Sequence, residues 1–248
     1  SYHNLSEIMG INGLSKANGI LLDLGISSLQ INSENRGFSF QSNAPADMRF
    51  DQTKGQTAKD LIRKSSEKEL ADIIYQFGEE RKSRRISNSI KKIKNLSTTM
   101  DLKEAIRKST PPHHRNKTHA RVFQAIRIAV NDEIDKLKSF LKIFLDYLEI
   151  GGRLVVISYH SIEDRIVKHS FRQLNNESKV ELLTRKPLTP STGEIKLNKR
   201  SRSAKMRALE RDLSYYKKRE GDMDRKQISL VHDVQGIAAK ELLTKVRK

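Results

Sequence analysis

An apolar run near the start of the chain ends on residues that could do chemistry. Residues 19–22, Gly-Ile-Leu-Leu, are followed at once by Asp23 and then by Ser27, Ser28 and Gln30. The run predicts a buried strand that delivers the Asp23 carboxylate to a loop. In open α/β sheets, ligands bind beyond the carboxyl ends of the strands, where the loops diverge. We therefore expect a ligand site here, although the pattern also suits an Asp that only caps the next element.

A second apolar run with a polar end occurs far along the chain. Residues 154–157, Leu-Val-Val-Ile, are followed by Ser158, Tyr159 and His160. A short continuous apolar run of this kind is typical of a buried strand in a parallel sheet. If the two strands are neighbours, Ser158 and His160 lie near Asp23 in one crevice. The sequence leaves open whether they are neighbours.

The segment between the two strands predicts a helical insertion and a connecting helix. Residues 32–56 have no helical period, and a loop of this length is usually functional or disordered. Its apolar side chains, Phe38, Phe40, Met48 and Phe50, argue against disorder. From residue 57 to residue 93, apolar side chains at three- and four-residue spacings predict several short helices. Residues 121–150 carry an apolar stripe that predicts one long helix. The Gly151-Gly152 pair is expected to end this helix as a C-terminal cap.

The net charge of +18 is concentrated in two stretches. Residues 81–117 hold twelve Lys and Arg against two acidic residues, and residues 196–220 hold ten against three, so the rest of the chain is nearly neutral. Two separate positive regions indicate a polyanionic partner, most simply nucleic acid, whereas one charge run is usually a solvated face. Arg81, Arg84 and Arg85 open a predicted helix, and guanidinium groups can bind phosphates in a bidentate manner.

The composition excludes several kinds of site. The absence of cysteine excludes disulfides, thiolate nucleophiles and thiolate metal sites. His113, His114 and His119 lie in a Pro-rich basic loop, where we expect solvated imidazoles and no metal site. No apolar run approaches the roughly 18 residues of a membrane span, and residues 1–10 lack the order of a signal peptide. The sequence therefore predicts a cytoplasmic protein with no membrane contact.

Ten short motifs, in order from Tyr2 to about Arg211, resemble those of the family of 16S ribosomal RNA cytosine-N4-methyltransferases, the ribosomal RNA small subunit methyltransferases H. They are Asp23-Leu-Gly-Ile-Ser-Ser-Leu-Gln, Arg36-Gly-Phe-Ser-Phe, Asp47-Met-Arg-Phe-Asp, Gly55-Gln-Thr-Ala, Gly78-Glu-Glu-Arg, Phe123-Gln-Ala-Ile-Arg-Ile-Ala-Val-Asn, Gly151-Gly-Arg-Leu, Ser158-Tyr-His-Ser-Ile-Glu-Asp-Arg-Ile-Val-Lys, Lys186-Pro-Leu-Thr-Pro and Arg202-Ser-Ala-Lys-Met-Arg.

The resemblance implies an α/β fold with a class I, Rossmann-like methyltransferase sheet, N-terminally incomplete, and an inserted helical subdomain. Residues 1–30 and 118–211 would form the methyltransferase domain, residues 31–117 the insertion on the substrate side, and residues 212–248 a tail of unknown role. The implied reaction moves a methyl group from S-adenosyl-L-methionine to the exocyclic N4 amine of a cytosine in 16S rRNA. The partner is this RNA within the small ribosomal subunit, at the decoding centre, and a homodimer is left open.

The resemblance also implies roles for single residues. Tyr2, Asp23 and Gln30 match cofactor contacts, and Asp23, Ser158 and His160 are expected to serve catalysis. A target base must leave its stack to reach such a pocket, and aromatic side chains, Tyr159 among them, are candidates to stack on it. The expected contacts to substrate RNA are Arg36, Phe38, Phe40, Arg81, Arg84, Arg85, Arg202 and Lys205.

The chain departs from the family pattern in places. The family begins with a strand and a glycine-rich loop for the methionine end of the cofactor, followed by an acid for its ribose, and these 248 residues contain neither. We therefore expect a chain that lacks its first strands and binds the cofactor weakly. The alternative function is a non-catalytic fragment that still binds rRNA. Lys117-Thr-His-Ala-Arg also differs from the family motif, which leaves the role of those positions open.

Overall fold

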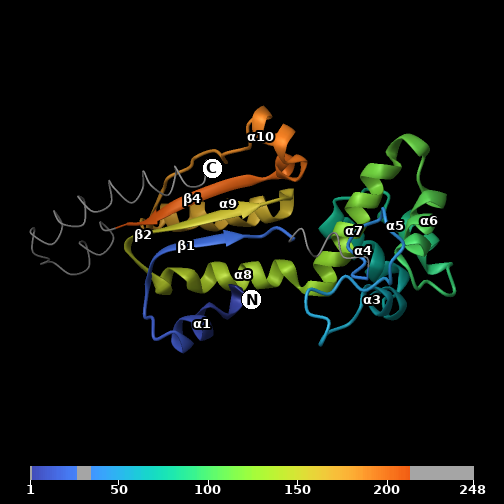
Figure 1. Ribbon diagram of the computed structural model, residues 1–248, viewed down its shortest axis with the longest axis horizontal. Coiled ribbons are helices and arrows are strands. Elements are labelled where there is room, and N and C mark those ends of the chain that lie inside the picture. Colours follow the sequence, from blue (N-terminus) through green and yellow to red (C-terminus); the bar gives the residue numbers. More distant parts are fainter. Residues whose placement is uncertain (1, 27–34, 213–248) are drawn as a thin grey trace, which may run out of the picture. The chain divides into compact units, whose positions relative to one another are not determined.

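The structure, a computed structural model, describes residues 2–26 and 35–212 (Figure 1). The described residues form two compact units, the first within residues 1–25 and 136–248 and the second within residues 26–135. The sequence predicted an inserted helical unit that ends at residue 117. In the structure the second unit continues to Asp135, because the next long helix packs within it.

The first unit is built on a four-stranded sheet in the order β1-β2-β4-β3. Its strands are β1 (Ala17–Asp23), β2 (Leu148–Ser158), β3 (Val180–Leu182) and β4 (Lys205–Arg211). β1 pairs with β2 in parallel, and β4 pairs with β2 and with β3 in antiparallel fashion. The two strands that carry the polar ends are therefore neighbours, as the shared crevice requires.

Helices cover one face of this sheet. Leu154 and Val156 of β2 are buried there in one cluster with Phe140 and Phe171 from two helices, while Leu21 of β1 remains 60% exposed. The elements are η1 (Tyr2–Asn4), α1 (Leu5–Ile11), α8 (Glu133–Ile143), which begins at the unit boundary, η3 (Phe144–Tyr147), α9 (Ser161–Asn176), α10 (Thr192–Leu197) and η4 (Lys199–Ser203).

The second unit is helical, as predicted, and has its own apolar core. Its elements are α3 (Ala58–Lys64), α4 (Glu67–Gly78), α5 (Ser83–Lys91), α6 (Thr99–Ser109), η2 (Pro112–His114) and α7 (Arg115–Asn131). Thr57, Ser66 and Thr98 begin α3, α4 and α6 with capping boxes, so the sequence fixes these helix starts locally. In the part of the chain that the structure describes, no helix has the length and apolar character needed to cross a membrane.

Two expectations about the connecting segment were wrong. The helix predicted for residues 121–150 is divided by Asp132, which takes a left-handed conformation with φ 51° and caps α7. The apolar spacing continues through this break, and for that reason periodicity alone could not reveal it. Gly151-Gly152 does not cap a helix either, because both glycines lie within β2, where Gly151 has a φ of 74°.

Candidate active site at the ends of β1 and β2

The paired register of β1 and β2 brings their polar ends together. Asp23, the last residue of β1, pairs with Ile157 of β2, so Ser158 and Tyr159 follow directly beside it. The backbone N–H of Leu24 donates to the carbonyl of Ile157 at 3.0 Å, which continues the pairing by one residue. The expected pairing of the two strands is confirmed, and it brings Asp23 next to the residues at the end of β2.

Asp23, Gly25 and Tyr159 form a tight cluster at this end of the sheet. The exposed Asp23 carboxylate accepts a hydrogen bond from the Gly25 backbone N–H, with 3.0 Å between nitrogen and Oδ1. A Cβ on Gly25 would lie 2.7 Å from Cε2 of Tyr159 and 3.1 Å from Oδ1 of Asp23. Only glycine therefore lets the Tyr159 ring lie this close to the loop beside the carboxylate.

The Tyr159 hydroxyl is held in its protonated form. Burial of the ring and the negative charge of Asp23, with which the hydroxyl is hydrogen-bonded, raise the pKa of Tyr159 to about 12. The hydroxyl is protonated at neutral pH, as any phenol is, and it can donate to the carboxylate. Tyr159 thus orients Asp23, a role that the sequence did not indicate because its side chain was considered only for base stacking.

Ser158 and His160 both have partners within the scaffold. The buried Ser158 hydroxyl donates to the backbone carbonyl of Lys205 in β4, with 3.3 Å between oxygens. His160 precedes α9, and its Nδ1 accepts from the backbone N–H of Glu163 at 3.3 Å. Its Nε2 lies 3.1 Å from Oε1 of Glu163. These contacts fix the turn between β2 and α9, and catalytic roles for the two residues stay predictions.

Glu163 ties this turn to the candidate site. Its Oε2 accepts from the backbone N–H of Tyr159 at 3.0 Å, while its Oε1 faces His160. A carboxylate that satisfies N–H groups ahead of the first turn of a helix stabilises that helix start. Tyr159 therefore leaves the strand in a direction that α9 determines.

The expected cofactor contacts are only partly within the described residues. Tyr2 lies in η1, where its ring packs edge-on against Phe140, with 5.9 Å between centroids, and against the core of the first unit. Its role toward a cofactor stays a prediction. Gln30, together with Ser27 and Ser28, lies outside the described residues.

Arg36 and Phe38 act within the loop of the second unit. The Arg36 guanidinium donates through Nη2 to the backbone carbonyls of Arg49, at 2.8 Å, and Phe50, at 2.9 Å. It also lies over the Phe38 ring, which stacks on Phe50 with 5.6 Å between centroids. Contacts among residues 36–50 therefore hold this loop in place. Contacts of Arg36 and Phe38 with RNA stay predictions.

Phe40 and His119 are packed together in the second unit. The Phe40 ring lies 5.6 Å from the rings of both His119 and Phe123, measured between centroids. His119 is buried, and this burial lowers the pKa of its imidazole. The expectation of three solvated imidazoles was therefore wrong for His119, because α7 turns it inward, whereas His113 and His114 are exposed.

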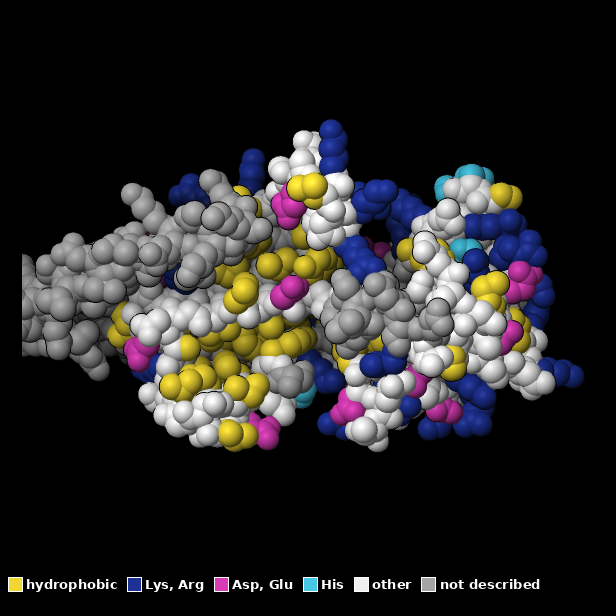
Figure 2. Space-filling view, in the orientation of Figure 1, with side chains coloured by type: hydrophobic (Ala, Val, Ile, Leu, Met, Phe, Trp, Pro, Cys, Tyr) yellow, Lys and Arg dark blue, Asp and Glu magenta, His cyan; other side chains and the backbone are white. Residues whose placement is uncertain are grey.

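The predicted phosphate contacts of the second unit are exposed. Arg81 lies just before α5 and Arg84 and Arg85 lie within it, and none of the three has an ion pair among the described residues. Figure 2 shows Lys and Arg side chains gathered on the surface of this unit. These cations are available to a polyanion.

In the second basic region, residues 196–220, some of the cations are paired with an acidic residue. Arg202 is exposed, but Lys205 donates through Nζ to Oδ2 of Asp164 at 3.3 Å. Asp164 also pairs with the buried Arg207, with 2.6 Å between Nε and Oδ1. The sequence does not reveal this pair, because the pair joins α9 to a strand residue 43 positions away.

A model of the MraW methylase family matches residues 1–212. Proteins named ribosomal RNA small subunit methyltransferase H are similar along most of the chain. The one from Thermosipho africanus is 47% identical over 215 residues, which are 85% of this chain and 72% of that protein. The one from Thermotoga neapolitana is 46% identical over 216 residues, 85% of this chain and 71% of its own.

A third relative, from Synechococcus elongatus, is 48% identical over 198 residues, which cover 79% of this chain and 66% of that protein. The family match begins ahead of α1 and continues through β4, so it includes both strands that meet at Asp23 and all of the helical unit between them. This chain belongs to the MraW methylase family of methyltransferases.

Proposed function

We propose that this protein methylates the RNA of the small ribosomal subunit, with S-adenosyl-L-methionine as the methyl donor. The target is the exocyclic N4 amine of a cytosine in the decoding centre of 16S rRNA, and the protein acts in the cytoplasm. The names of the relatives support this RNA as the substrate. The observation that carries the proposal is the exposed Asp23 carboxylate, which is oriented by Tyr159 at the ends of two parallel strands.

The residues around Asp23 fit the reactive end of this cofactor, which supplies an electrophilic methyl group on a positively charged sulfonium. The Asp23 carboxylate offers a negative charge and acceptor atoms beyond the carboxyl end of β1, where α/β sheets bind ligands. Gly25 contributes no side chain beside Oδ1, so nothing from this position covers the carboxylate. Tyr2 and Gln30 are the further residues that we assign to cofactor binding.

A cytosine amine is a poor nucleophile, because its lone pair is delocalised into the ring. Asp23 accepts a hydrogen bond from the amine and so turns the nitrogen lone pair toward the methyl carbon. Such positioning can account for a large part of a rate enhancement. Transfer of the methyl group would form an N–C bond, break the C–S bond and release one amine proton, and we assign Asp23 as the acceptor of that proton.

The test is methyl transfer to small ribosomal subunits that lack this modification. The full-length protein is incubated with the subunits and S-adenosyl-L-methionine labelled on its methyl group, and the RNA is digested and analysed by mass spectrometry. We expect N4-methylcytidine at a single position. Label on another atom would contradict the assignment of the target, and RNA binding without incorporation would identify a non-catalytic RNA-binding protein.

A further inference from the structure

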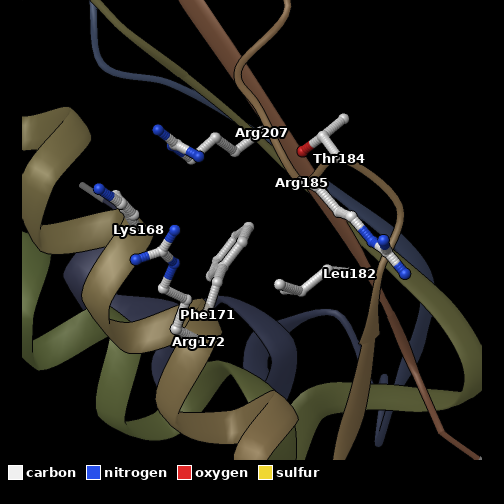
Figure 3. A pocket seen from close by; sticks show the side chains of 7 residues that line it. All are labelled: Lys168, Phe171, Arg172, Leu182, Thr184, Arg185 and Arg207. Carbon is white, nitrogen blue, oxygen red and sulfur yellow. The ribbon is translucent and has the colours of Figure 1, made fainter.

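A small pocket on the first unit is lined by cations from separate elements (Figure 3). Lys168 and Arg172 come from α9 and Arg207 comes from β4, and the Phe171 ring lies between them and the apolar side chain of Leu182. In Figure 3 the charged groups of these three residues lie on the same side of the Phe171 ring. The candidate active-site residues do not line this pocket.

The charge at this pocket is only partly balanced. Asp164 accepts from Arg207 through Nε at 2.6 Å and through Nη2 at 3.3 Å, and from Lys205 at 3.3 Å. Burial opposes ionisation of Asp164, but the hydrogen bonds and charges of these two cations outweigh it and hold the pKa of Asp164 below its usual value. One carboxylate thus serves two cations, and Nη1 of Arg207 has no acceptor among the described residues.

The two cations on α9 increase the imbalance. Lys168 and Arg172 stand four positions apart on one helix, a spacing at which like charges repel. Neither has an ion pair with a described residue. A bound anion would remove this repulsion, and the apolar groups of Phe171 and Leu182 beside it would strengthen the attraction by lowering the local dielectric.

We propose that Lys168, Arg172 and Arg207 form a binding site for one backbone phosphate of an RNA strand. This inference rests on the proposed rRNA substrate and adds a contact outside the candidate active site. Arg207 is buried and already oriented by Asp164, so its guanidinium is a preorganised donor, whereas the two α9 side chains supply charge from the rim. A phosphate contact of this kind positions the RNA without reading its sequence.

The experiment measures the salt dependence of RNA binding by the full-length protein with a fluorescent single-stranded RNA. We expect the double variant Lys168→Gln/Arg172→Gln to bind more weakly and to flatten the slope of log K against log salt concentration by about 0.7, the value for one phosphate on a single strand. A matched control, Lys16→Gln/Lys142→Gln, removes two exposed lysines of the same unit that do not line the pocket, and we expect it to keep the slope.

A charge-retaining variant, Lys168→Arg/Arg172→Lys, should keep the parent slope, and circular dichroism checks that each variant is folded. An unchanged slope in the glutamine variant, or an equal change in the lysine control, would overturn the proposal. Inorganic phosphate is the second probe. Thermal stabilisation of the parent by phosphate that is lost in the glutamine variant, with no change in RNA slope, would make this a site for free anions and overturn the RNA assignment.

The salt-dependence experiment and the methyl-transfer test of the proposed function can fail independently of each other. If the parent methylates small subunits and the slope is unchanged, the phosphate site fails and the proposed reaction stands. If the slope changes but no methyl group is transferred, the phosphate site stands and the proposed reaction fails.

Discussion

At the scale of single residues, the position of the Asp23 carboxylate depends on two neighbours with different tasks. Gly25 donates its backbone N–H and, because it has no side chain, lets the Tyr159 ring approach. The Tyr159 hydroxyl lies beside the negative charge of Asp23, which contributes to its raised pKa. These two neighbours orient the carboxylate before any substrate binds, which is the advantage of preorganisation.

Replacing Tyr159 by Phe tests this orienting role. The variant keeps the ring against Gly25 and removes the hydrogen bond to Asp23, which at a charged acceptor contributes about 1.5–3 kcal/mol. We expect kcat for methyl transfer to fall about 10-fold or more, with little change in KM for the RNA. Tyr147→Phe, a tyrosine of η3 away from this end of the sheet, serves as the control. Equal kcat values for Tyr159→Phe and the parent would contradict the role.

At the scale of elements, the second unit depends on the close approach of α4 and α7. A Cβ on Gly78, the last residue of α4, would lie 2.7 Å from the carbonyl oxygen of Arg121 and 3.3 Å from Cβ of Ala125. Near this contact, Gln124 donates to the carbonyl of Phe77 at 3.0 Å. The backbones of α4 and α7 are therefore in direct contact here, and a side chain at position 78 would clash with α7.

We expect Gly78→Ala to lower the free energy of unfolding by about 1–3 kcal/mol, the usual cost of overpacking. The control is Gly10→Ala in α1, where a Cβ has no atom within 4 Å. That change should be neutral or stabilise by up to about 1 kcal/mol, because alanine favours helices over glycine. Urea unfolding followed by circular dichroism measures both, and similar stabilities of the two variants would contradict the close packing.

The ion pair between α9 and β4 predicts a pH dependence. Asp164→Asn leaves the buried Arg207 without its anionic partner, which should cost about 3 kcal/mol at neutral pH. The pKa of Asp164 in the folded protein is below its usual value of 3.8, so this stabilisation is present above that value and is lost as the pH falls through the lower folded-state pKa.

Urea unfolding at a series of pH values tests this dependence. The difference in stability between parent and Asp164→Asn should be constant near neutral pH and should shrink as the pH falls below about 4. Asp146→Asn, at an exposed aspartate of the same unit, should differ little from the parent. A difference between parent and Asp164→Asn that stayed constant down to acid pH would show that the charge of Asp164 is not its source.

The elements also show what a sequence can predict and why the rest escapes it. Segments with local signals, such as the apolar strand before Asp23 and the helices that follow residue 57, were predicted because their apolar spacing is set by neighbouring residues. The break at Asp132 was missed because a single left-handed residue leaves the apolar spacing intact. The position of Asp23 at a strand end could be predicted from the apolar run before it. Its contact with Tyr159 could not, because that contact depends on which strands pair.

At the scale of the whole molecule, the charge distribution predicts how RNA is bound. Twelve of the basic residues lie between positions 81 and 117. Neutralising the cluster Arg81, Lys82, Arg84 and Arg85 should flatten the slope of log K against log salt by roughly three, if each cation contacts one phosphate. Replacing the exposed Lys59, Lys64 and Lys68 of the same unit should leave the slope nearly unchanged. A parent-like slope in the cluster variant would assign these charges to solubility.

In the second basic region, residues 196–220, Lys205 is paired with Asp164. Loss of Lys205 should therefore change the salt slope less than loss of a cation that has no acidic partner. A variant that neutralises Lys199, Arg200, Arg202 and Lys205 therefore has to be compared with one that spares Lys205. In the proposed function, charge directs the RNA to the protein and the reaction is assigned to one carboxylate.

The most direct test of the central claim replaces Asp23 by Ala in the full-length protein and measures methyl incorporation into small-subunit RNA from labelled cofactor. If Asp23 positions the amine and accepts its proton, as we propose, methyl transfer is abolished while the affinity for RNA, measured in parallel, stays close to that of the parent. Methyl transfer at the parent rate would contradict the account, and so would an equal loss of RNA binding, because Asp23 would then act on RNA affinity instead of on the reaction.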